Sequence, residues 1–333
     1  MAVYYLQTGS TDPAYNLAFE EYVLTNRTNG SYLILWQNAN SVIIGRNQNA
    51  EAEINRSFVD QHNIRVIRRN TGGGAVYHDL GNLNYSFITD AGDPENRNAE
   101  RFTTPIVRTL RSLGLDAAAS GRNDILVSGR KVSGTAQQLL KGRILHHGTL
   151  LFDTDSNMIA GALNPDPSKF QFKGVQSVRS RVGSIRSALQ KDMTLTEFWQ
   201  YLKAALAEDG ILPTSLTIEE LAQIEILKKE KYDTWQWNFG RSPKFQTCCK
   251  QRFPGGLLEL HLTIKQGLIE NLQILGDFLA LTELSPMEQA LIGCAYKEDA
   301  VRTVLDKFPF FEYLGNITKN EFIETLFNKK EAS

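Results

Sequence analysis

Twelve consecutive residues, 68–79, combine the residue types that bind an anionic ligand. They read Arg-Arg-Asn-Thr-Gly-Gly-Gly-Ala-Val-Tyr-His-Asp. Three glycines in a row leave the backbone N–H groups open to close approach, and glycine adopts a positive φ without a steric penalty. Arg68 and Arg69 precede them, and a guanidinium binds phosphate or carboxylate oxygens through paired donors. These residue types predict a binding loop for a nucleotide or another anion.

This glycine loop matches neither of two common nucleotide-binding motifs. No Lys-Ser or Lys-Thr pair follows the glycines, which excludes a Walker loop, and the Gly-x-Gly-x-x-Gly spacing of dinucleotide-binding folds is absent. The apolar residues just before it, 64–67, are typical of a strand that leads into a loop. A glycine-rich surface turn with two solvated arginines is the alternative interpretation.

Lys131 is the sharpest single candidate for a catalytic side chain. Segment 123–136 is predicted to form a hairpin whose turn lies at Ser128-Gly129. In a regular returning strand, Lys131 and Ser133 lie on the same face. A lysine held on a strand among small residues leaves room for a substrate above it. An exposed lysine at a strand end is the alternative interpretation.

Two further features are typical of phosphate chemistry. Segment 167–191 contains six cations and no acid, which predicts either a basic loop that closes over a phosphate ligand or a solvated basic loop. Asp79 and Asp124 are candidate ligands of Mg²⁺, because that ion takes one or two carboxylates together with phosphate oxygens. Either aspartate could instead cap a turn.

Before residue 240, the pattern of apolar residues predicts alternating strands and helices. Helices are expected to begin at Asp12-Pro13 and Thr104-Pro105. Two more are expected after the capping boxes at Thr194 and Thr217. The mixture predicts an α/β or α+β domain built on a sheet. Two tryptophans near its end, 235 and 237, alternate as they would in a strand.

A second unit is expected after the turn-rich stretch around residues 240–256. Residues 258–264 and 268–275 alternate as two strands of a hairpin, and capping boxes at Ser285 and Thr318 open helices. We therefore divide the chain into a domain over 1–244, a linker over 245–254 and a small α+β domain over 255–333.

Composition limits the class of protein. The 333 residues carry 36 Lys and Arg against 37 Asp and Glu, a net charge of −1, so we expect no general attraction to nucleic acid or to anionic membranes. The three cysteines, at 248, 249 and 294, form neither a disulfide framework nor a metal-ligand spacing, which suits a reducing compartment. Neither a signal peptide nor a long apolar span is found in the sequence. We expect a cytoplasmic protein.

Taken together, these segments resemble the lipoate–protein ligases. The glycine loop is similar to that family's ligand-binding loop, and 121–124 with 130–134 is similar to its lysine-bearing segment. Residues 173–182 resemble its adenylate-covering loop, and 238–240 resembles the end of its large domain. The resemblance implies an α+β fold, with a large mixed-sheet catalytic domain of the biotin/lipoate protein ligase type and a small C-terminal accessory domain, as in the two-domain bacterial members.

The resemblance also implies a two-step reaction. Lipoate and ATP, with Mg²⁺, give lipoyl-adenylate and pyrophosphate, and the lipoyl group then passes to one lysine of a lipoyl-domain protein. The acceptors would be E2 subunits of 2-oxoacid dehydrogenases or the glycine cleavage H protein. Because like charges 4 Å apart repel by about 4 kcal/mol at an effective dielectric of ~20, fixed cations must assist the attack of a carboxylate on a phosphate.

By the same resemblance, each motif has an expected role. Lys131 would be catalytic and would contact both the nucleotide and the lipoyl carboxyl group. The expected ATP-binding residues are Arg69, Gly74, Ala75, Val76, Tyr77 and Lys131. The expected lipoate-binding residues are Gly72, Gly73, Gly74 and Lys131. The expected adenylate-covering residues are Lys173, Gly174, Arg179 and Arg181, and Asp124 would hold the metal.

The closest competing function is an octanoyl- or lipoyl-transferase that takes its acyl group from another carrier. Such relatives use a cysteine thioester, and no cysteine precedes Cys248 in this chain, so the nucleophile is missing where it is needed. The Gly-Arg-Gly-Arg loop typical of biotin ligases is also absent. A ligand sensor or an RNA-binding protein is disfavoured by the net charge near zero.

Overall fold

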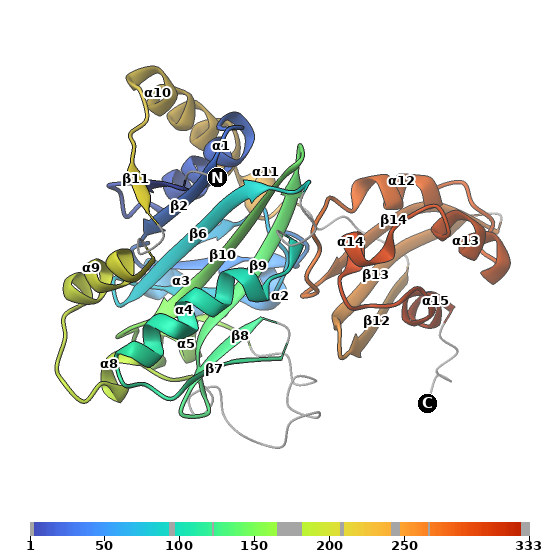
Figure 1. Ribbon diagram of the computed structural model, residues 1–333. Coiled ribbons are helices and arrows are strands. Elements are labelled where there is room, and N and C mark those ends of the chain that lie inside the picture. The colour runs from blue at the N-terminus through green and yellow to red at the C-terminus, as the bar shows by residue number, and fades with distance from the viewer. Residues whose placement is uncertain are drawn as a thin grey trace.

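The computed structural model describes residues 3–92, 97–121, 123–164, 182–206, 210–240, 247–265 and 267–327. It consists of two domains, each with its own sheet and apolar core (Figure 1). No helix in the described ranges has both the length and the apolar character needed to cross a lipid bilayer.

The N-terminal domain is built on a mixed sheet of eight strands. Their order is β11-β1-β2-β6-β10-β9-β8-β7, in which β1 pairs in parallel with β2 and β11 and the remaining pairs are antiparallel. The strands are β1 (Val3–Gln7), β2 (Ser31–Trp36), β6 (Asn82–Asp90), β7 (Ala117–Ser120), β8 (Asp124–Val127), β9 (Arg130–Leu140), β10 (Arg143–Leu151) and β11 (Ile211–Pro213). A sheet of three strands, ordered β4-β3-β5, lies beside it: β3 (Ser41–Ile44), β4 (Arg65–Arg68) and β5 (Val76–His78).

Helices cover both faces of the large sheet. One face packs on α4 (Glu100–Ser112) and α9 (Leu195–Leu206), and the other packs on α1 (Pro13–Asn26). Figure 1 shows α4 lying across the sheet on the side of the viewer. The remaining helices of this domain are α2 (Ala50–Glu53), α3 (Arg56–Gln61), α5 (Ser156–Ala162), α8 (Ile185–Ala188), α10 (Ile218–Leu227), the π-helix η2 (Lys228–Tyr232) and α11 (Trp235–Asn238).

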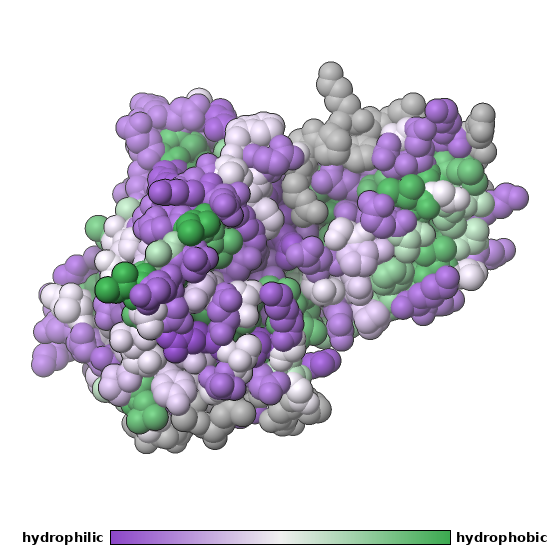
Figure 2. All heavy atoms as spheres, turned by 90° about the horizontal axis from the view of Figure 1, so that it is seen from above, coloured by the Kyte–Doolittle hydropathy of each residue, from purple (hydrophilic) through white to green (hydrophobic). Residues whose placement is uncertain are grey.

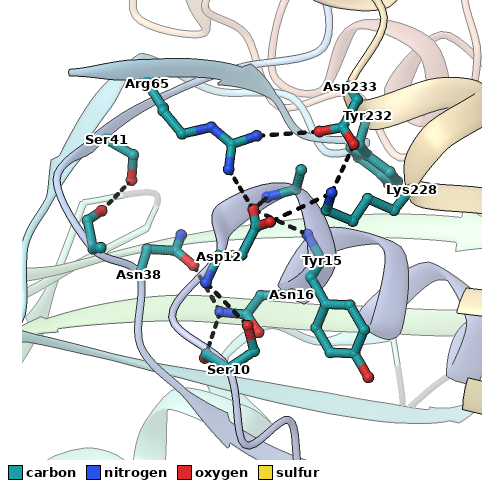
Figure 3. Close-up of polar contacts among 12 residues, drawn as sticks. Ser10, Asp12, Tyr15, Asn16, Asn38, Ser41, Arg65, Lys228, Tyr232 and Asp233 are labelled. Atoms are coloured by element: carbon teal, nitrogen blue, oxygen red, sulfur yellow. Dashed lines mark hydrogen bonds and ion pairs between the residues drawn. The ribbon is translucent and has the colours of Figure 1, made fainter. Parts of the chain in front are cut away.

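An ionic cluster fixes the beginning of α1. Asp12 caps the helix by accepting a hydrogen bond from Ala14 N at 2.9 Å, as the Asp12-Pro13 pair predicts. Figure 3 shows the same carboxylate with Arg65 at 2.6 Å and Lys228 at 3.5 Å, and both cations also pair with Asp233. Because Arg65 begins β4, the cluster ties α1 to the strand that leads into the glycine loop.

The C-terminal domain is a three-stranded antiparallel sheet with helices on one face. The strands are β12 (Thr247–Phe253), β13 (Gly256–Lys265) and β14 (Leu268–Gly276), and the helices are α12 (Ser285–Leu291), α13 (Glu298–Leu305), α14 (Phe310–Leu314) and α15 (Lys319–Phe327). The expected hairpin of β13 and β14 is present. The expected linker over 245–254 is wrong for residues 247–253, because β12 pairs along its whole length with β13 and belongs to this sheet.

The two domains touch through backbone hydrogen bonds around the glycine loop. Gly73 N donates to Phe278 O at 2.9 Å, and Gly276 N donates to Asn47 O at 2.7 Å. An ion pair between Arg46 and Glu283, 2.5 Å apart, lies at the same contact. Seen from above, the domains form two lobes that meet at a mostly hydrophilic junction (Figure 2).

Three helices differ from the sequence expectation. Residues 235–238 form α11, which Thr234 caps by accepting from Trp237 N, so the expected strand there is wrong. Helix α4 begins at Glu100 and contains Pro105 in its interior. At α12, Glu288 accepts a hydrogen bond from Ile274 N of β14 at 2.8 Å, so it fastens the helix to the sheet rather than completing a capping box.

Candidate active site

A cavity of about 300 Å³ opens between the glycine loop, strands β9 and β10, helix α1 and the C-terminal domain. Its lining combines apolar side chains with a few polar groups, which is typical of a small-molecule site. The lining residues are Leu17, Trp36, Ile43, Arg69, Gly73, Gly74, Ala75, Val76, His78, Asn84, Asn123, Asp124, Lys131, Gly134, Thr135, Ala136, His147, Gly148, Thr149, Asp277 and Leu279.

Arg69 holds the glycine loop in shape from within. Its guanidinium donates to Gly72 O at 2.6 Å, Gly74 O at 2.9 Å and Ile43 O at 3.1 Å. Burial lowers the pKa of Arg69 to about 10, with partial compensation from the carboxylate of Glu20, so the side chain stays charged at neutral pH. Most of its donors are therefore engaged by loop carbonyls, while one edge of the side chain reaches the cavity.

Arg68 is buried on the far side of the loop and has a structural role. Its guanidinium donates to the carbonyls of Gly45, Arg46 and Gln48 at 2.7–2.9 Å. Asn238 O accepts a further bond at 3.0 Å, and Arg68 is not among the residues that line the cavity. Of the two arginines before the glycines, only Arg69 reaches the candidate site.

Two of the three glycines are needed for different steric reasons. Gly73 has φ +87°, and a Cβ there would lie 3.1 Å from the Arg69 guanidinium and 3.2 Å from Leu279. At Gly72, a Cβ would meet Phe278 O at 2.6 Å. Gly72 therefore admits the backbone of the C-terminal domain, and Gly73 provides the left-handed conformation.

A buried polar chain supports the loop from beneath. Thr71 Oγ1 lies 2.7 Å from His147 Nε2, and His147 Nδ1 lies 2.9 Å from Glu20 Oε1. Ser86 donates to the same carboxylate at 2.5 Å. Because Arg69 Nε also donates to Thr71 Oγ1 at 2.9 Å, helix α1 and strand β10 fix the loop through a connected chain of hydrogen bonds.

Across the cavity, the expected hairpin of β8 and β9 presents Lys131. Ser128 and Gly129 both have positive φ, 48° and 76°, as a two-residue turn requires. Lys131 Nζ lies 2.7 Å from Asp124 Oδ1, and a Cβ at Gly134 would lie only 3.2 Å from Nζ. The ammonium thus rests over a glycine, next to one carboxylate, with 37% of the lysine side chain exposed.

A β-bulge separates Lys131 from Ser133. Lys131 lies opposite Leu126 and Ser133 opposite Ile125, which leaves Val132 as an extra residue in β9. Val132 joins the core on the side of α4, and Ser133 is buried beside Tyr85 on that same side. The expectation that Lys131 and Ser133 share a face is therefore wrong, because a bulge reverses the alternation of the strand.

His78 and Asn84 bring polar atoms without partners to the cavity. Asn16 donates to Asn38 Oδ1 at 2.9 Å, so the Asn38 amide presents its nitrogen to His78 Nδ1 at 3.0 Å. That contact leaves the proton on Nε2, which is buried without a hydrogen-bond partner, as is Asn84 Nδ2. Burial, followed by the charge of Arg69, lowers the pKa of His78 to about 3, so the imidazole is neutral.

Comparisons with known proteins give the family. The model of the lipoyl protein ligase A/B catalytic domain matches residues 12–207, and that of the bacterial lipoate protein ligase C-terminus matches residues 242–326. This chain belongs to the lipoate–protein ligase family. It is 43% identical to lipoate-protein ligase LplJ of Bacillus subtilis over 321 residues, which covers 95% of this chain and 97% of the relative.

Solved structures of ligases have the same fold. The complex of P. falciparum LipL1 with lipoate superimposes with a TM-score of 0.78 at 25% identity, covering 97% of each chain. A lipoate-protein ligase A bound with ATP superimposes with a TM-score of 0.61 at 30% identity, covering 72% of this chain and 98% of its own. The expected α+β fold, with a mixed-sheet catalytic domain and a C-terminal domain, is confirmed.

The structure places the expected site residues of this ligase unevenly. Arg69, Gly73, Gly74, Ala75, Val76, Asp124 and Lys131 line the cavity. Gly72 instead contacts the C-terminal domain, and the Tyr77 hydroxyl points away to Asn40 Oδ1 at 3.0 Å. Asp79 has the structural role, because it accepts from Gly81 N and Asp155 N. Lys173, Gly174, Arg179 and Arg181 lie outside the described residues.

The described residues that follow this segment begin beside Lys131. Gly183 N donates to Lys131 O at 2.8 Å, so the chain returns to the described part directly beside the candidate catalytic lysine. Arg186, part of the basic stretch 167–191, pairs with Asp153 at 2.8 Å and Asp192 at 3.1 Å. That cation has a local structural role.

Several lining residues were missed by reasoning from the sequence. Trp36, Asn84 and His147 come from different strands and meet only because β2, β6 and β10 are neighbours in the sheet. Asp277 and Leu279 come from the other domain. No local sequence pattern marks these positions. Their meeting in one cavity depends on which strands are neighbours in the sheet, so it could not be predicted without the topology.

Proposed function

We propose that this chain activates lipoate with ATP to lipoyl-adenylate and then transfers the lipoyl group to a lysine of a lipoyl-domain protein. One observation carries the proposal: a single cavity brings the glycine loop and Lys131 together in a chain that belongs to the lipoate–protein ligase family. Lipoate and ATP are the ligands named for the family structures of similar fold.

In the first step, a carboxylate oxygen of lipoate attacks the α-phosphorus of ATP. A new P–O bond forms, the bond from the α-phosphorus to the oxygen that bridges the α- and β-phosphates breaks, and pyrophosphate leaves. Lys131 lines the same cavity as the glycine loop, and its ammonium pairs with Asp124 at 2.7 Å. Its ammonium offsets the repulsion between the carboxylate and the phosphate and stabilises the charge of the transition state.

In the second step, the unprotonated amine of the acceptor lysine attacks the carbonyl carbon of lipoyl-adenylate. The C–N bond forms, the C–O bond to AMP breaks, and the nitrogen releases a proton to solvent. The mixed anhydride is prone to hydrolysis, so a shielded cavity favours transfer over loss to water. Shielding is the role expected from the sequence for residues 173–182, of which the structure describes only Val182.

The glycine loop shapes the binding surface for both substrates. Gly74, Ala75 and Val76 line the cavity next to Arg69 and offer it backbone groups and small side chains. We assign ATP contact to these residues and lipoate contact to Gly73, Gly74 and Lys131. Apolar lining from Leu17, Trp36 and Ile43 suits the hydrocarbon chain of lipoate. We retain Gly72 and Tyr77 as supports of the loop.

Asp124 fits a role as a magnesium ligand. Mg²⁺ commonly takes one or two carboxylates together with phosphate oxygens, and Asp124 is a cavity carboxylate that faces Lys131. The other lining carboxylate, Asp277, is engaged by Arg252 at 3.2 Å and by Leu257 N at 2.6 Å. Bound Mg²⁺ would supply positive charge to the phosphates, and Asp124 would hold it.

The competing transferase function lacks its nucleophile. All three cysteines of the chain are described, all lie in the C-terminal domain, and none lines the cavity. An acyl-cysteine intermediate would need a thiol beside the acyl group. The cysteines are unpaired, which agrees with the cytoplasmic location that forms part of this proposal.

The proposal is tested by incubating the full chain with lipoate, ATP, Mg²⁺ and a purified lipoyl domain of an E2 subunit. We expect intact-mass spectrometry to detect one lipoyl group on the acceptor, and none when ATP is omitted. An acceptor whose target lysine is replaced by arginine is the matched control and stays unmodified. Modification from an acyl-carrier thioester without ATP, but not from free lipoate with ATP, would favour the transferase, and no modification of any lipoyl domain would contradict the proposal.

A further inference from the structure

A cluster of metal-ligand side chains lies on the C-terminal domain, outside the cavity. Cys248 of β12 is directly opposite His261 of β13, and Glu259 lies two residues before His261 on the same strand. Positions two apart in a strand share a face, and so do directly paired positions on neighbouring strands. The sheet therefore brings a thiol, an imidazole and a carboxylate to one side.

The ligand atoms lie at separations that suit one tetrahedral ion. Cys248 Sγ is 3.6 Å from His261 Nε2 and 3.8 Å from Glu259 Oε1. Around Zn²⁺, with Zn–S near ~2.3 Å and Zn–N or Zn–O near ~2.0–2.1 Å, a tetrahedron requires S···N and S···O edges of about 3.6 Å. Glu259 Oε1 is 2.6 Å from His261 Nε2, a hydrogen bond that opens by less than about 1 Å to admit an ion.

This face of the sheet is separate from the apolar core. Leu258, Leu260 and Leu262 of β13 point into the core, whereas Glu259 and His261 alternate with them on the outer side. The neighbouring thiol, Cys249, packs against the core and lies 4.0 Å from Leu326 O. Two adjacent cysteines thus occupy opposite faces of β12, and only Cys248 belongs to the cluster.

We propose that Cys248, Glu259 and His261 form a zinc site that joins β12 to β13. The set combines a soft thiolate with an imidazole and a carboxylate, which selects Zn²⁺ over the harder Mg²⁺ that accompanies ATP. Three protein ligands leave the fourth tetrahedral position to water. On binding, the Zn–S bond forms and the S–H bond breaks, with release of the thiol proton to solvent.

Other roles for these residues fit the geometry less well. Cys248 is exposed and has no disulfide partner among the described residues. The sulfurs of the other two cysteines, Cys249 and Cys294, contact the backbone carbonyls of Leu326 and Ala295. Lys250 pairs with Glu259 at 3.5 Å and orients that carboxylate, as an outer hydrogen-bond partner does for a metal ligand.

The site would stabilise the strand that begins the C-terminal domain. β12 is an edge strand, bonded to β13 alone within the three-stranded sheet. An ion shared by both strands adds its binding free energy to the stability of the fold. The inference does not depend on the proposed activity, because none of the three ligands lines the cavity.

Cobalt provides the direct test, because Co²⁺ occupies zinc sites and a thiolate ligand gives it a charge-transfer absorption band in the near ultraviolet. The full chain, reduced and freed of metal with a chelator, is titrated with Co²⁺ in the absence of ATP. We expect one equivalent to produce the band, and excess Zn²⁺ to abolish it. Cys248→Ser should eliminate the band, and His261→Asn should weaken cobalt affinity by about 100-fold, because one ligand is lost.

Cys249→Ser is the matched control and should keep the band, since its sulfur faces the core. Circular dichroism confirms that each variant is folded, and Zn²⁺ should raise the melting temperature of the parent and of Cys249→Ser but not of Cys248→Ser. Absence of a thiolate band in the parent, or a band that survives Cys248→Ser, would overturn the site.

Discussion

The two sides of the cavity are built in opposite ways. On one side, the guanidinium that shapes the glycine loop is committed to the fold: Arg69 is 7% exposed and bonds to loop carbonyls. On the other side, the β8–β9 hairpin carries Lys131, whose side chain is 37% exposed and whose ammonium contacts one carboxylate. One side is fixed before any ligand arrives, while the other side keeps a charge available.

The glycine loop therefore provides the shape of the binding surface, and the hairpin provides a positive charge. A loop held by the donors of Arg69 supplies a rigid surface, and the stabilisation of charge in the reaction is assigned to Lys131, which is not committed to the fold. Substitutions in the loop should therefore change binding and stability together. Substitutions at the hairpin lysine should change the reaction without changing the stability of the fold, and the following predictions test that division.

The largest effect is expected at Lys131. Lys131→Ala should lower the rate of adenylate formation by about 10³-fold or more, because it removes the charge that offsets carboxylate–phosphate repulsion. The midpoint of thermal unfolding should change little, since the side chain is partly exposed. Single-turnover kinetics and calorimetry measure the two quantities. Lys141→Ala, in the exposed β9–β10 turn, is the control, and a near-normal rate for Lys131→Ala would place the chemistry elsewhere.

A smaller but dual effect is expected at Gly73. Gly73→Val should weaken lipoate and ATP binding by about tenfold or more and destabilise the fold by about 1–2 kcal/mol, because a β-branched residue resists positive φ. Gly142→Val separates strain from contact, since Gly142 has φ +75° and open space around its Cβ position. Isothermal calorimetry measures the affinities for lipoate and ATP. If Gly73→Val binds both ligands as tightly as the parent and Gly142→Val do, the loop has a structural role only.

The smallest effect concerns pH and distinguishes the buried side from the exposed side. The folded-state pKa of His78, about 3, lies below its unfolded value near ~6.5, so only the unfolded chain gains this proton as the pH falls between them. The free energy of unfolding should drop by about 1.4 kcal/mol per pH unit in that window from this residue. Denaturant titrations at pH 7, 6 and 5 measure the free energy of unfolding across this range. In His78→Gln, the part of its pH dependence that comes from this histidine should be absent.

The matched control for this prediction is His62→Gln, at the partly exposed end of α3. It makes the same change of residue type at a histidine that does not line the cavity. Equal slopes for the parent and His78→Gln would show that the imidazole is not held neutral by burial, and the description of the loop side as a dry, preformed surface would have to be revised.

Local patterns predicted much of this molecule. The cap at Asp12, the turn at Ser128-Gly129 and the capping boxes at Thr217 and Thr318 depend on neighbours within a few residues, and each is present. The glycine loop and Lys131 were singled out by residue type alone, and the cavity contains both. Features that depend on residues close together in the sequence could therefore be predicted from the sequence alone.

What depends on distant contacts could not be predicted. The bulge at Val132 moves Ser133 to the other face because the register with β8 shifts, and no residue type signals it. The exclusion of Arg68 from the site follows from carbonyls of residues 45–48 and 238, which fold around it. The role of Gly72 depends on a backbone more than 200 residues away, at Phe278.

Lipoate-dependent exchange of pyrophosphate into ATP, without any acceptor protein, tests the central claim most directly. We expect exchange that requires lipoate and Mg²⁺, that Lys131→Ala abolishes, and that Lys141→Ala retains. Exchange that is absent from the folded parent protein at saturating lipoate and ATP would contradict it, because the cavity would then bind without activating the acid.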